Sequence, residues 1–212
     1  MRNFGELLEI QIPDSVSNLK LPDPALMNYY NDKQHRTFWL DYEIGGGVSF
    51  ELIKEILEIN RADLGLEYDE RKPIKIMINS GGGCCIEGSS IVDAITNSKT
   101  PIYTINMGMC YSMAGIVFMC GHQRYMMPSS SVLIHSGSLF VHNDTTKVID
   151  YMEFNSAINN RIDELIVKST FLTKEQLESK KTKEWYILAK ECSDLGICDG
   201  VIGEDISLEE LI

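Results

Sequence analysis

The chain has 212 residues, a mass of 23.9 kDa and a net charge of -12, with 31 Asp and Glu against 19 Lys and Arg. This length suits one sizeable α/β domain with a full hydrophobic core and leaves no room for a second large domain. An acidic chain repels a phosphate backbone, so the composition argues against a nucleic-acid partner.

No signal peptide or membrane span is expected. The first ten residues carry one basic residue but no long apolar stretch or small-residue cleavage site. No later run approaches the roughly 18 apolar residues that cross a bilayer. The six cysteines form no Cys-x-x-Cys pair and have no histidine at ligand spacing, so most are expected to be reduced core residues. We therefore expect a cytoplasmic protein without a metal, a cofactor or a membrane partner.

The first 35 residues are the least regular part of the chain. Pro13, Pro22, Pro24 and several polar stretches predict a mostly irregular arm or loop. Such an arm is either a tolerated surface segment or a docking element.

From residue 36 onward, strands and helices alternate. The expected order is strand 36–41, helix 49–58, strand 73–79, helix 84–95, strand 101–107, a helix from 113, and strand 131–135, with Met127-Pro128 closing the third unit. This alternation predicts βαβ crossovers and a largely parallel sheet, with functional residues at the carboxyl ends of the strands.

The chain changes character after His135. Residues 139–144 can form an extra strand, 146–170 form a long amphipathic helix, and Thr173-Lys-Glu-Gln176 is a capping box for a short helix. The long helix either mediates assembly or packs on the core, and the sequence leaves both open.

The candidate nucleophile is Ser112, which lies between the strand ending near Met107 and the helix starting at Met113. At such a turn the hydroxyl can point into a cleft, and the free N–H groups of the first helical turn favour a developing negative charge there. The motif is not the Gly-x-Ser-x-Gly elbow, because Cys110 and Ala114 occupy the outer positions. A serine here is also a common helix cap, so the assignment depends on its partners.

Two further features lie at strand ends. Ser80-Gly-Gly-Gly83 precedes a helix but lacks both the Lys-Ser/Thr of a P-loop and the spacing of a dinucleotide fingerprint. This glycine turn is better suited to an oxyanion hole, to which it would contribute the second N–H donor beside the amide of Met113. His135 ends its strand and can take the proton of Ser112.

Three motifs in the same order resemble the proteolytic subunit of the caseinolytic (Clp) protease family. The chain has Ile78-Asn-Ser-Gly-Gly-Gly83, Gly108-Met-Cys-Tyr-Ser-Met-Ala-Gly115 and Pro128-Ser-Ser-Ser-Val-Leu-Ile-His135. The family has Ile-Asn-Ser-Pro-Gly-Gly, Gly-x-Ala-Ala-Ser-Met-Gly-Ala and Pro-Asn-Ser-x-x-Met-Ile-His. The resemblance, from about Arg36 to Gly203, implies an α/β fold of the Clp protease and crotonase type, a spiral of ββα units with a protruding handle helix. It divides the chain into an arm (1–35), a protease domain (36–203, with the handle at about 136–172) and a tail (204–212).

The resemblance also implies site residues. By it, Ser112 is the nucleophile, His135 is the general base, and Gly83 and Met113 donate the oxyanion N–H groups. Counting back from the turn at 194–199 places Glu184 at the position of the family's catalytic Asp. A carboxylate there holds the imidazole tautomer, and because Glu is one methylene longer we expect activity with altered geometry. A structural surface role for Glu184 stays open.

Four departures from the family concern partners. Gly81 replaces a proline, bulky residues 139–142 replace a Gly-rich handle strand, Thr182-Lys183 replace a charged pair, and the arm differs from the family's axial loops. These departures leave the contacts between rings and the docking of an unfoldase open.

The resemblance implies a serine endopeptidase that acts on unfolded polypeptides delivered by an AAA+ unfoldase. Its assembly would be a homo-oligomer of heptameric rings stacked as a tetradecamer. Alternatives are a non-catalytic or weakly active ring subunit, a crotonase-type acyl-CoA enzyme, and a peptidase of the same fold that uses a Lys base. No Lys lies near Ser112 in the sequence.

Overall fold

The computed structural model describes residues 23–47, 49–137 and 144–211. Its elements are α1 (Pro24–Gln34), β1 (Thr37–Leu40), α2 (Ser49–Ala62), η2 (Tyr68–Glu70), β2 (Ile74–Ser80), α3 (Cys85–Thr96), β3 (Ile102–Tyr111), α4 (Met113–Met119), β4 (Gln123–Met126), β5 (Ser131–Ile134), α5 (Thr145–Ser169), α6 (Lys174–Lys180), β6 (Trp185–Leu188), α7 (Ala189–Asp194), β7 (Gly200–Val201) and η3 (Leu208–Glu210). Within these residues, no helix is long and apolar enough to cross a membrane.

The sheet is mostly parallel, as the alternation of strands and helices predicted. Neighbouring strands run β1-β2-β3-β4-β7, and each of these pairs is parallel. β3 changes partner along its length, because residues 103–106 pair with β4 while residues 109–111 pair with β5. β6 then pairs with β5 in the antiparallel direction.

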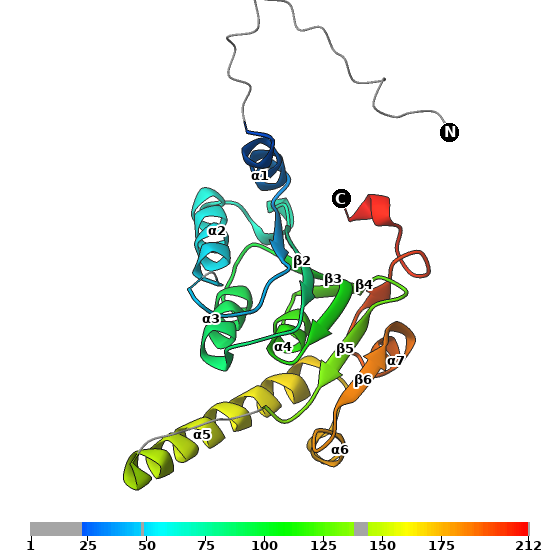
Figure 1. The fold of residues 1–212 in the computed structure, drawn as a ribbon. Helices are drawn as coiled ribbons and strands as arrows, with labels where there is room; N and C mark the ends of the chain where they lie inside the picture. The colour runs from blue at the N-terminus through cyan, green and yellow to red at the C-terminus, as the bar shows by residue number, and fades with distance from the viewer. Residues whose placement is uncertain (1–22, 48, 138–143, 212) are drawn as a thin grey trace, which may run out of the picture.

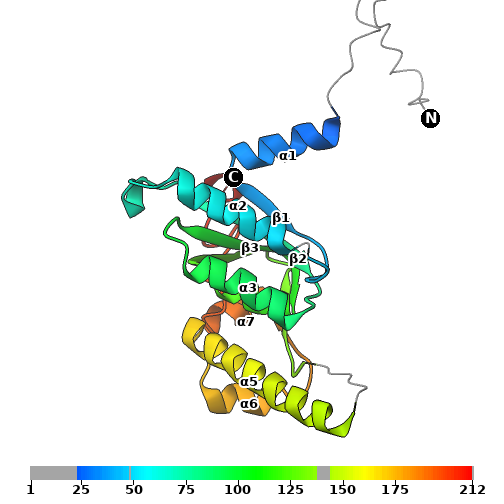
Figure 2. The same cartoon turned by 90° about the vertical axis from the view of Figure 1, so that its left-hand side faces the viewer.

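The two faces of the sheet carry different cores. The alternation of β2 sends Ile74, Ile76 and Ile78 into the main cluster, which also holds residues of α2, α3 and α4. Figure 2 shows α2 and α3 over the same face of the sheet. Met77 joins a smaller cluster on the opposite face with Leu211 near the C-terminus. The helical face therefore supplies most of the buried apolar surface.

The prediction of an irregular arm through residue 35 is wrong for its last part, because α1 is a helix. Asp23 is its N-cap and accepts a hydrogen bond from Ala25 N at 2.9 Å, and Pro24 occupies the first turn, where its missing N–H costs nothing. α1 buries none of its residues, so it has no amphipathic pattern to reveal it. The earlier part of the arm lies outside the described residues.

Four strands also differ from prediction, among them β6 and β7, where the sequence predicted no strand. β3 continues to Tyr111 rather than ending at Met107, since β5 offers its last residues a second partner. β4 was not predicted at all, because its four residues, QRYM, show no clear alternation and are ordered by pairing with β3 and β7.

The long helix α5 projects from the body of the molecule (Figure 1). Only Ile166, near its C-terminal end, is buried. The capping box before α6 is confirmed, because Thr173 Oγ1 accepts from Gln176 N at 3.2 Å and Thr173 N donates to Gln176 Oε1 at 2.9 Å. The possible strand at 139–144 lies, except for Asp144, outside the described residues.

Candidate active site

Ser112 is the single residue that joins β3 to α4, and its backbone is strained. Its φ of 53° and ψ of -127° lie in a region that L-residues other than glycine rarely occupy. The turn is held by Ser112 N, which donates to Leu133 O at 2.9 Å, and by Ser112 O, which accepts from Gly115 N at 2.9 Å. A strained strand-to-helix turn of this kind presents a side chain at the edge of a sheet.

Glycines allow the chain to close around Ser112. A Cβ on Gly82 would lie 2.6 Å from Tyr111 O and 2.8 Å from Ser112 Cβ, and Gly82 has a φ of 97°. A Cβ on Gly115 would lie 3.0 Å from Cys110 O. Larger residues at Gly82 would therefore push the glycine turn away from the serine.

His135 directly follows β5. Because Tyr111 pairs with Leu133, the strand carries His135 to the same end of the sheet as Ser112. His135 Nε2 is buried and makes no hydrogen bond within the described part of the chain. Of the other described histidines, His122 accepts from Ile102 N at 2.8 Å and His35 contacts Asn31 O, so both serve local structure.

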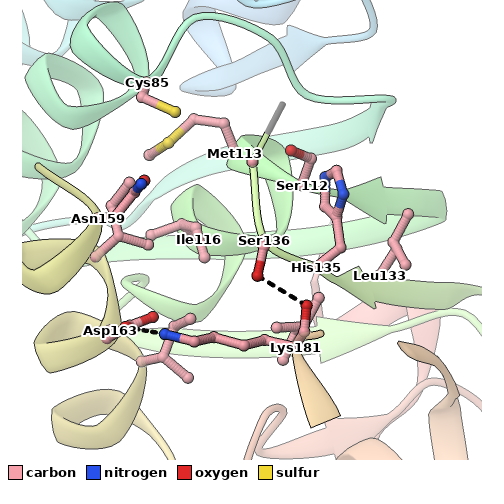
Figure 3. Close-up of a pocket in the computed structure, with 14 residues that line it drawn as sticks. Cys85, Ser112, Met113, Ile116, Leu133, His135, Ser136, Asn159, Asp163 and Lys181 are labelled. Atoms are coloured by element: carbon pink, nitrogen blue, oxygen red, sulfur yellow. Dashed lines mark hydrogen bonds and ion pairs between the residues drawn. The ribbon is translucent and has the colours of Figure 1, made fainter. Parts of the chain in front are cut away.

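Ser112 and His135 line one pocket of about 100 Å³. Figure 3 shows both side chains at one end of it and the side chain of Lys181 crossing the other end toward Asp163. Between them the walls are mostly apolar, from Met113, Ile116, Leu133, Ile134, Ile162 and Ile166. No hydrogen bond joins Ser112 Oγ to His135 in the described residues, so the two groups share the pocket without a formed contact.

Of the two predicted oxyanion donors, Met113 directly follows Ser112 and lines its pocket, whereas Gly83 follows Gly82, which packs against Ser112, and lines a different pocket. Met113 is the first residue of α4, so its N–H has no acceptor within the helix. Gly83 forms a parallel bridge with Ile44 in which Ile44 N bonds Gly82 O and Cys84 N bonds Ile44 O, both at 2.7 Å. In this pattern the N–H of Gly83 points away from Ile44. Neither amide makes a hydrogen bond within the described residues.

Glu184 lies just before β6 and is exposed to solvent. Its Oε2 accepts a hydrogen bond from Tyr186 OH at 3.0 Å. Glu184 is not among the residues that line the pocket, and within the described residues it makes no hydrogen bond with His135. The structure thus brings Ser112, His135, Gly83 and Met113 to one end of the sheet. The side chain of Glu184 instead bonds Tyr186, a residue of the strand that Glu184 precedes.

Lys181 is a pocket residue that the sequence did not reveal. Its Nζ pairs with Asp163 on α5 and with Glu178 at 3.0 Å, and its backbone O accepts from Ser136 N at 2.8 Å and Ser136 Oγ at 2.9 Å. Burial disfavours its charge, but the hydrogen bonds to Asp163 and Glu178 outweigh burial and raise its pKa. The only sequence signal was the run of lysines before β6, which does not specify a partner.

The sequence model of the Clp protease family matches residues 34–205 of this chain. The chain belongs to the Clp protease family. Its fold is similar to that of a ClpP1 mutant from Listeria monocytogenes, with a TM-score of 0.73 and 20% sequence identity. This match covers 87% of the present chain and 99% of the Listeria chain. Both the predicted family and the α/β fold class are confirmed, and α5 is the protruding helix of this Clp family member.

Proposed function

We propose that this Clp family member is a serine endopeptidase in which Ser112 is the nucleophile and His135 the general base. The observation that carries the proposal is the position of the two residues: a serine on a strained turn lines one pocket with a buried imidazole nitrogen that makes no hydrogen bond within the described part of the chain. Backbone strain and unsatisfied buried polar atoms concentrate at functional sites.

In the proposed reaction, His135 takes the proton of Ser112 Oγ as this oxygen attacks the carbonyl carbon of the scissile peptide bond. The N–H groups of Gly83 and Met113 stabilise the oxyanion of the tetrahedral intermediate. The imidazolium then protonates the leaving amine, which leaves an acyl group on Ser112, and water releases the acyl group with His135 again as base. Glu184 is the proposed carboxylate partner of the imidazole.

The pocket also indicates which side chain the enzyme would accept next to the scissile bond. Its walls near Ser112 are apolar, and the Lys181–Asp163 pair closes the far end. An apolar side chain of moderate length fits such a space, whereas a carboxylate would be buried against apolar walls beside a lysine that Asp163 and Glu178 already pair.

A lysine base is disfavoured by the environment of Lys181. Catalytic lysines need a lowered pKa so that the neutral amine is available. The pKa of Lys181 is raised instead, since two carboxylates hold it. The imidazole is therefore the better base in this pocket.

Members of the Clp family form oligomeric rings that work with AAA+ partners. For this chain we propose a homo-oligomer of stacked heptameric rings in the cytoplasm, which degrades unfolded polypeptides delivered by an AAA+ unfoldase. The Clp family membership supports this assembly, and the six unpaired cysteines suit a reducing compartment.

A fluorophosphonate probe tests the chemistry directly. We expect one adduct per chain, located by mass spectrometry on Ser112, and none on the Ser112→Ala variant. The Ser179→Ala variant removes an exposed serine of α6 as a control and should label like the wild type. A wild-type protein that forms no adduct, assembled or not, would instead support a non-catalytic ring subunit. Retained peptide turnover by Ser112→Ala would point to different chemistry altogether.

A further inference from the structure

The antiparallel pairing of β5 and β6 ends next to both His135 and Glu184. Leu133 pairs with Tyr186 and Ile134 with Trp185, and His135 and Glu184 are the adjoining residues of the two strands, where the regular pairing gives way to a bond from Ser136 N to Lys181 O. Residues directly opposite one another in an antiparallel pair project to the same face, with Cβ atoms about 4.5–5.5 Å apart. The two residues therefore lie at the same end of this strand pair.

The side chain of Glu184 nevertheless bonds elsewhere. Tyr186 lies two residues further along the chain, on the same face, and its hydroxyl donates to Glu184 Oε2 at 3.0 Å. This hydrogen bond is the main cause of a raised pKa for Tyr186, so the hydroxyl keeps its proton and remains a donor.

The ring of Tyr186 is itself held in place. It packs edge to face against Tyr111, with ring centroids 5.6 Å apart and an interplanar angle of 82°. Tyr111 immediately precedes Ser112, and its hydroxyl contacts Ser131 Oγ at 2.9 Å. Tyr186 is thus anchored to the strand of the proposed nucleophile while its hydroxyl holds the carboxylate.

We propose that Tyr186 is a positioning residue that competes with His135 for Glu184 and holds the carboxylate off the imidazole. This inference rests on the proposed function. It explains why Glu184, which lies at the same end of the β5–β6 pair as His135, makes no hydrogen bond with the imidazole in the described residues. In a Ser-His-acid triad the carboxylate would bind the Nδ1 side of the ring, and Nε2 would face Ser112. Rotation of the Glu184 side chain away from Tyr186 would complete the triad.

Removing the Tyr186 hydroxyl tests the competition. Without the competing hydroxyl, Glu184 is free to bind the imidazole, so Tyr186→Phe should raise the rate of Ser112 acylation by a fluorophosphonate about two- to tenfold. Phenylalanine keeps the ring contact with Tyr111. With a fluorogenic peptide, kcat should rise while KM stays unchanged, because Tyr186 does not line the pocket.

A double-mutant cycle separates this role from a structural one. In a Glu184→Gln background the Tyr186→Phe change should have no effect, since the charge that the hydroxyl holds is gone. Tyr68→Phe, at an exposed position on η2, is the matched control and should label like the wild type. An unchanged or lower rate for Tyr186→Phe, or the same increase in the Glu184→Gln background, overturns the proposal.

Crystal structures keep the test independent of the proposed chemistry. In Tyr186→Phe we expect a Glu184 oxygen within hydrogen-bond distance of the His135 ring, and in the wild type we expect it on Tyr186. If Glu184 stays away from His135 in the variant, Tyr186 does not restrain it. Absence of Ser112 labelling in every protein would contradict the peptidase function instead, and the crystal structures would still decide the role of Tyr186.

Discussion

At the scale of single residues, the backbone conformation of Ser112 places its side chain at the pocket but lowers the stability of the fold. A non-glycine residue in such a region costs on the order of 1–3 kcal/mol, and the hydrogen bonds from Ser112 N to Leu133 O and from Gly115 N to Ser112 O hold it there. Such a cost is reasonable at a residue whose hydroxyl must face the pocket.

We predict that Ser112→Gly is more stable than Ser112→Ala by about 1 kcal/mol, because glycine adopts this backbone conformation without strain. Both variants lack the hydroxyl, so their difference isolates the backbone contribution. Urea unfolding at neutral pH measures it. Equal stabilities, or a more stable alanine variant, would show that the turn is not strained.

A buried ion pair at the start of β1 is the second residue-scale feature. Asp63 is 2% exposed and accepts two hydrogen bonds of 2.7 Å from Arg36 and one of 2.8 Å from Thr100 Oγ1. The hydrogen bonds from Arg36 are the main cause of a lowered pKa for Asp63. Removing one partner of a buried pair leaves the other unpaired and costs about 3–5 kcal/mol.

We therefore predict that Asp63→Asn loses about 3 kcal/mol of unfolding free energy at pH 7. Because the folded pKa is lowered, the contribution of Asp63 is present above the unfolded pKa of about 3.9 and disappears as the pH falls through the folded value. Urea unfolding from pH 7 to pH 3 should show the two proteins converging in acid. Glu51→Gln, which breaks an exposed pair with Lys54, is the control and should change stability little.

At the scale of elements, Arg124 on β4 fastens the end of α5 to the sheet. Its guanidinium donates to Ser169 O at the end of α5, to Gly196 O at 3.0 Å, and to both carboxylate oxygens of Asp199. These acceptors lie before β7 and at the C-terminus of α5, so one planar side chain joins three segments.

We predict that Arg124→Lys destabilises the protein by about 1–3 kcal/mol, since an ammonium group cannot span these acceptors. Hydrogen exchange should rise first in the last turns of α5 and around β7. Arg161→Lys breaks only an exposed pair with Asp93 and serves as the control. Similar exchange in both variants would mean that Arg124 does not hold α5.

At the scale of the whole molecule, the outer half of α5 is an exposed apolar surface. Ile149, Tyr151, Met152 and Phe154 are each between 42% and 53% exposed. This helix projects from the body, and a surface of this kind on a projecting element commonly marks a protein contact (Figure 1). The proposed stacking of rings would cover it.

We predict that Phe154→Lys lowers the oligomer mass in light scattering, from about fourteen times the 23.9 kDa of one chain toward single rings. Glu153→Lys adds the same side chain at the neighbouring exposed position and should leave the mass unchanged. If the wild type itself were monomeric at micromolar concentration, the proposed assembly would be wrong. An unchanged mass for Phe154→Lys would place the contact elsewhere.

The core strands were predictable because their patterns are local. The apolar runs of β2, β3 and β5 and the periodicity of α2 and α5 follow from the side chains of each segment. α1 and β4 were not predictable from local patterns. α1 buries none of its residues, and β4 is ordered by pairing with strands, one of which is far away in the sequence. Local pattern fails where tertiary pairing decides the conformation.

The candidate site also has residues that the sequence revealed and contacts that only the structure revealed. Ser112, His135 and the glycine turn could be found because each ends or begins a recognisable element, although their catalytic roles stay predictions. The sequence alone determined the family, the parallel α/β core and the order of these residues, since short-range apolar periodicity and turn chemistry are written in neighbouring side chains. Only the tertiary structure decided that Lys181 closes the pocket and that Tyr186 holds Glu184, because such contacts depend on how strands register and where long side chains find a partner.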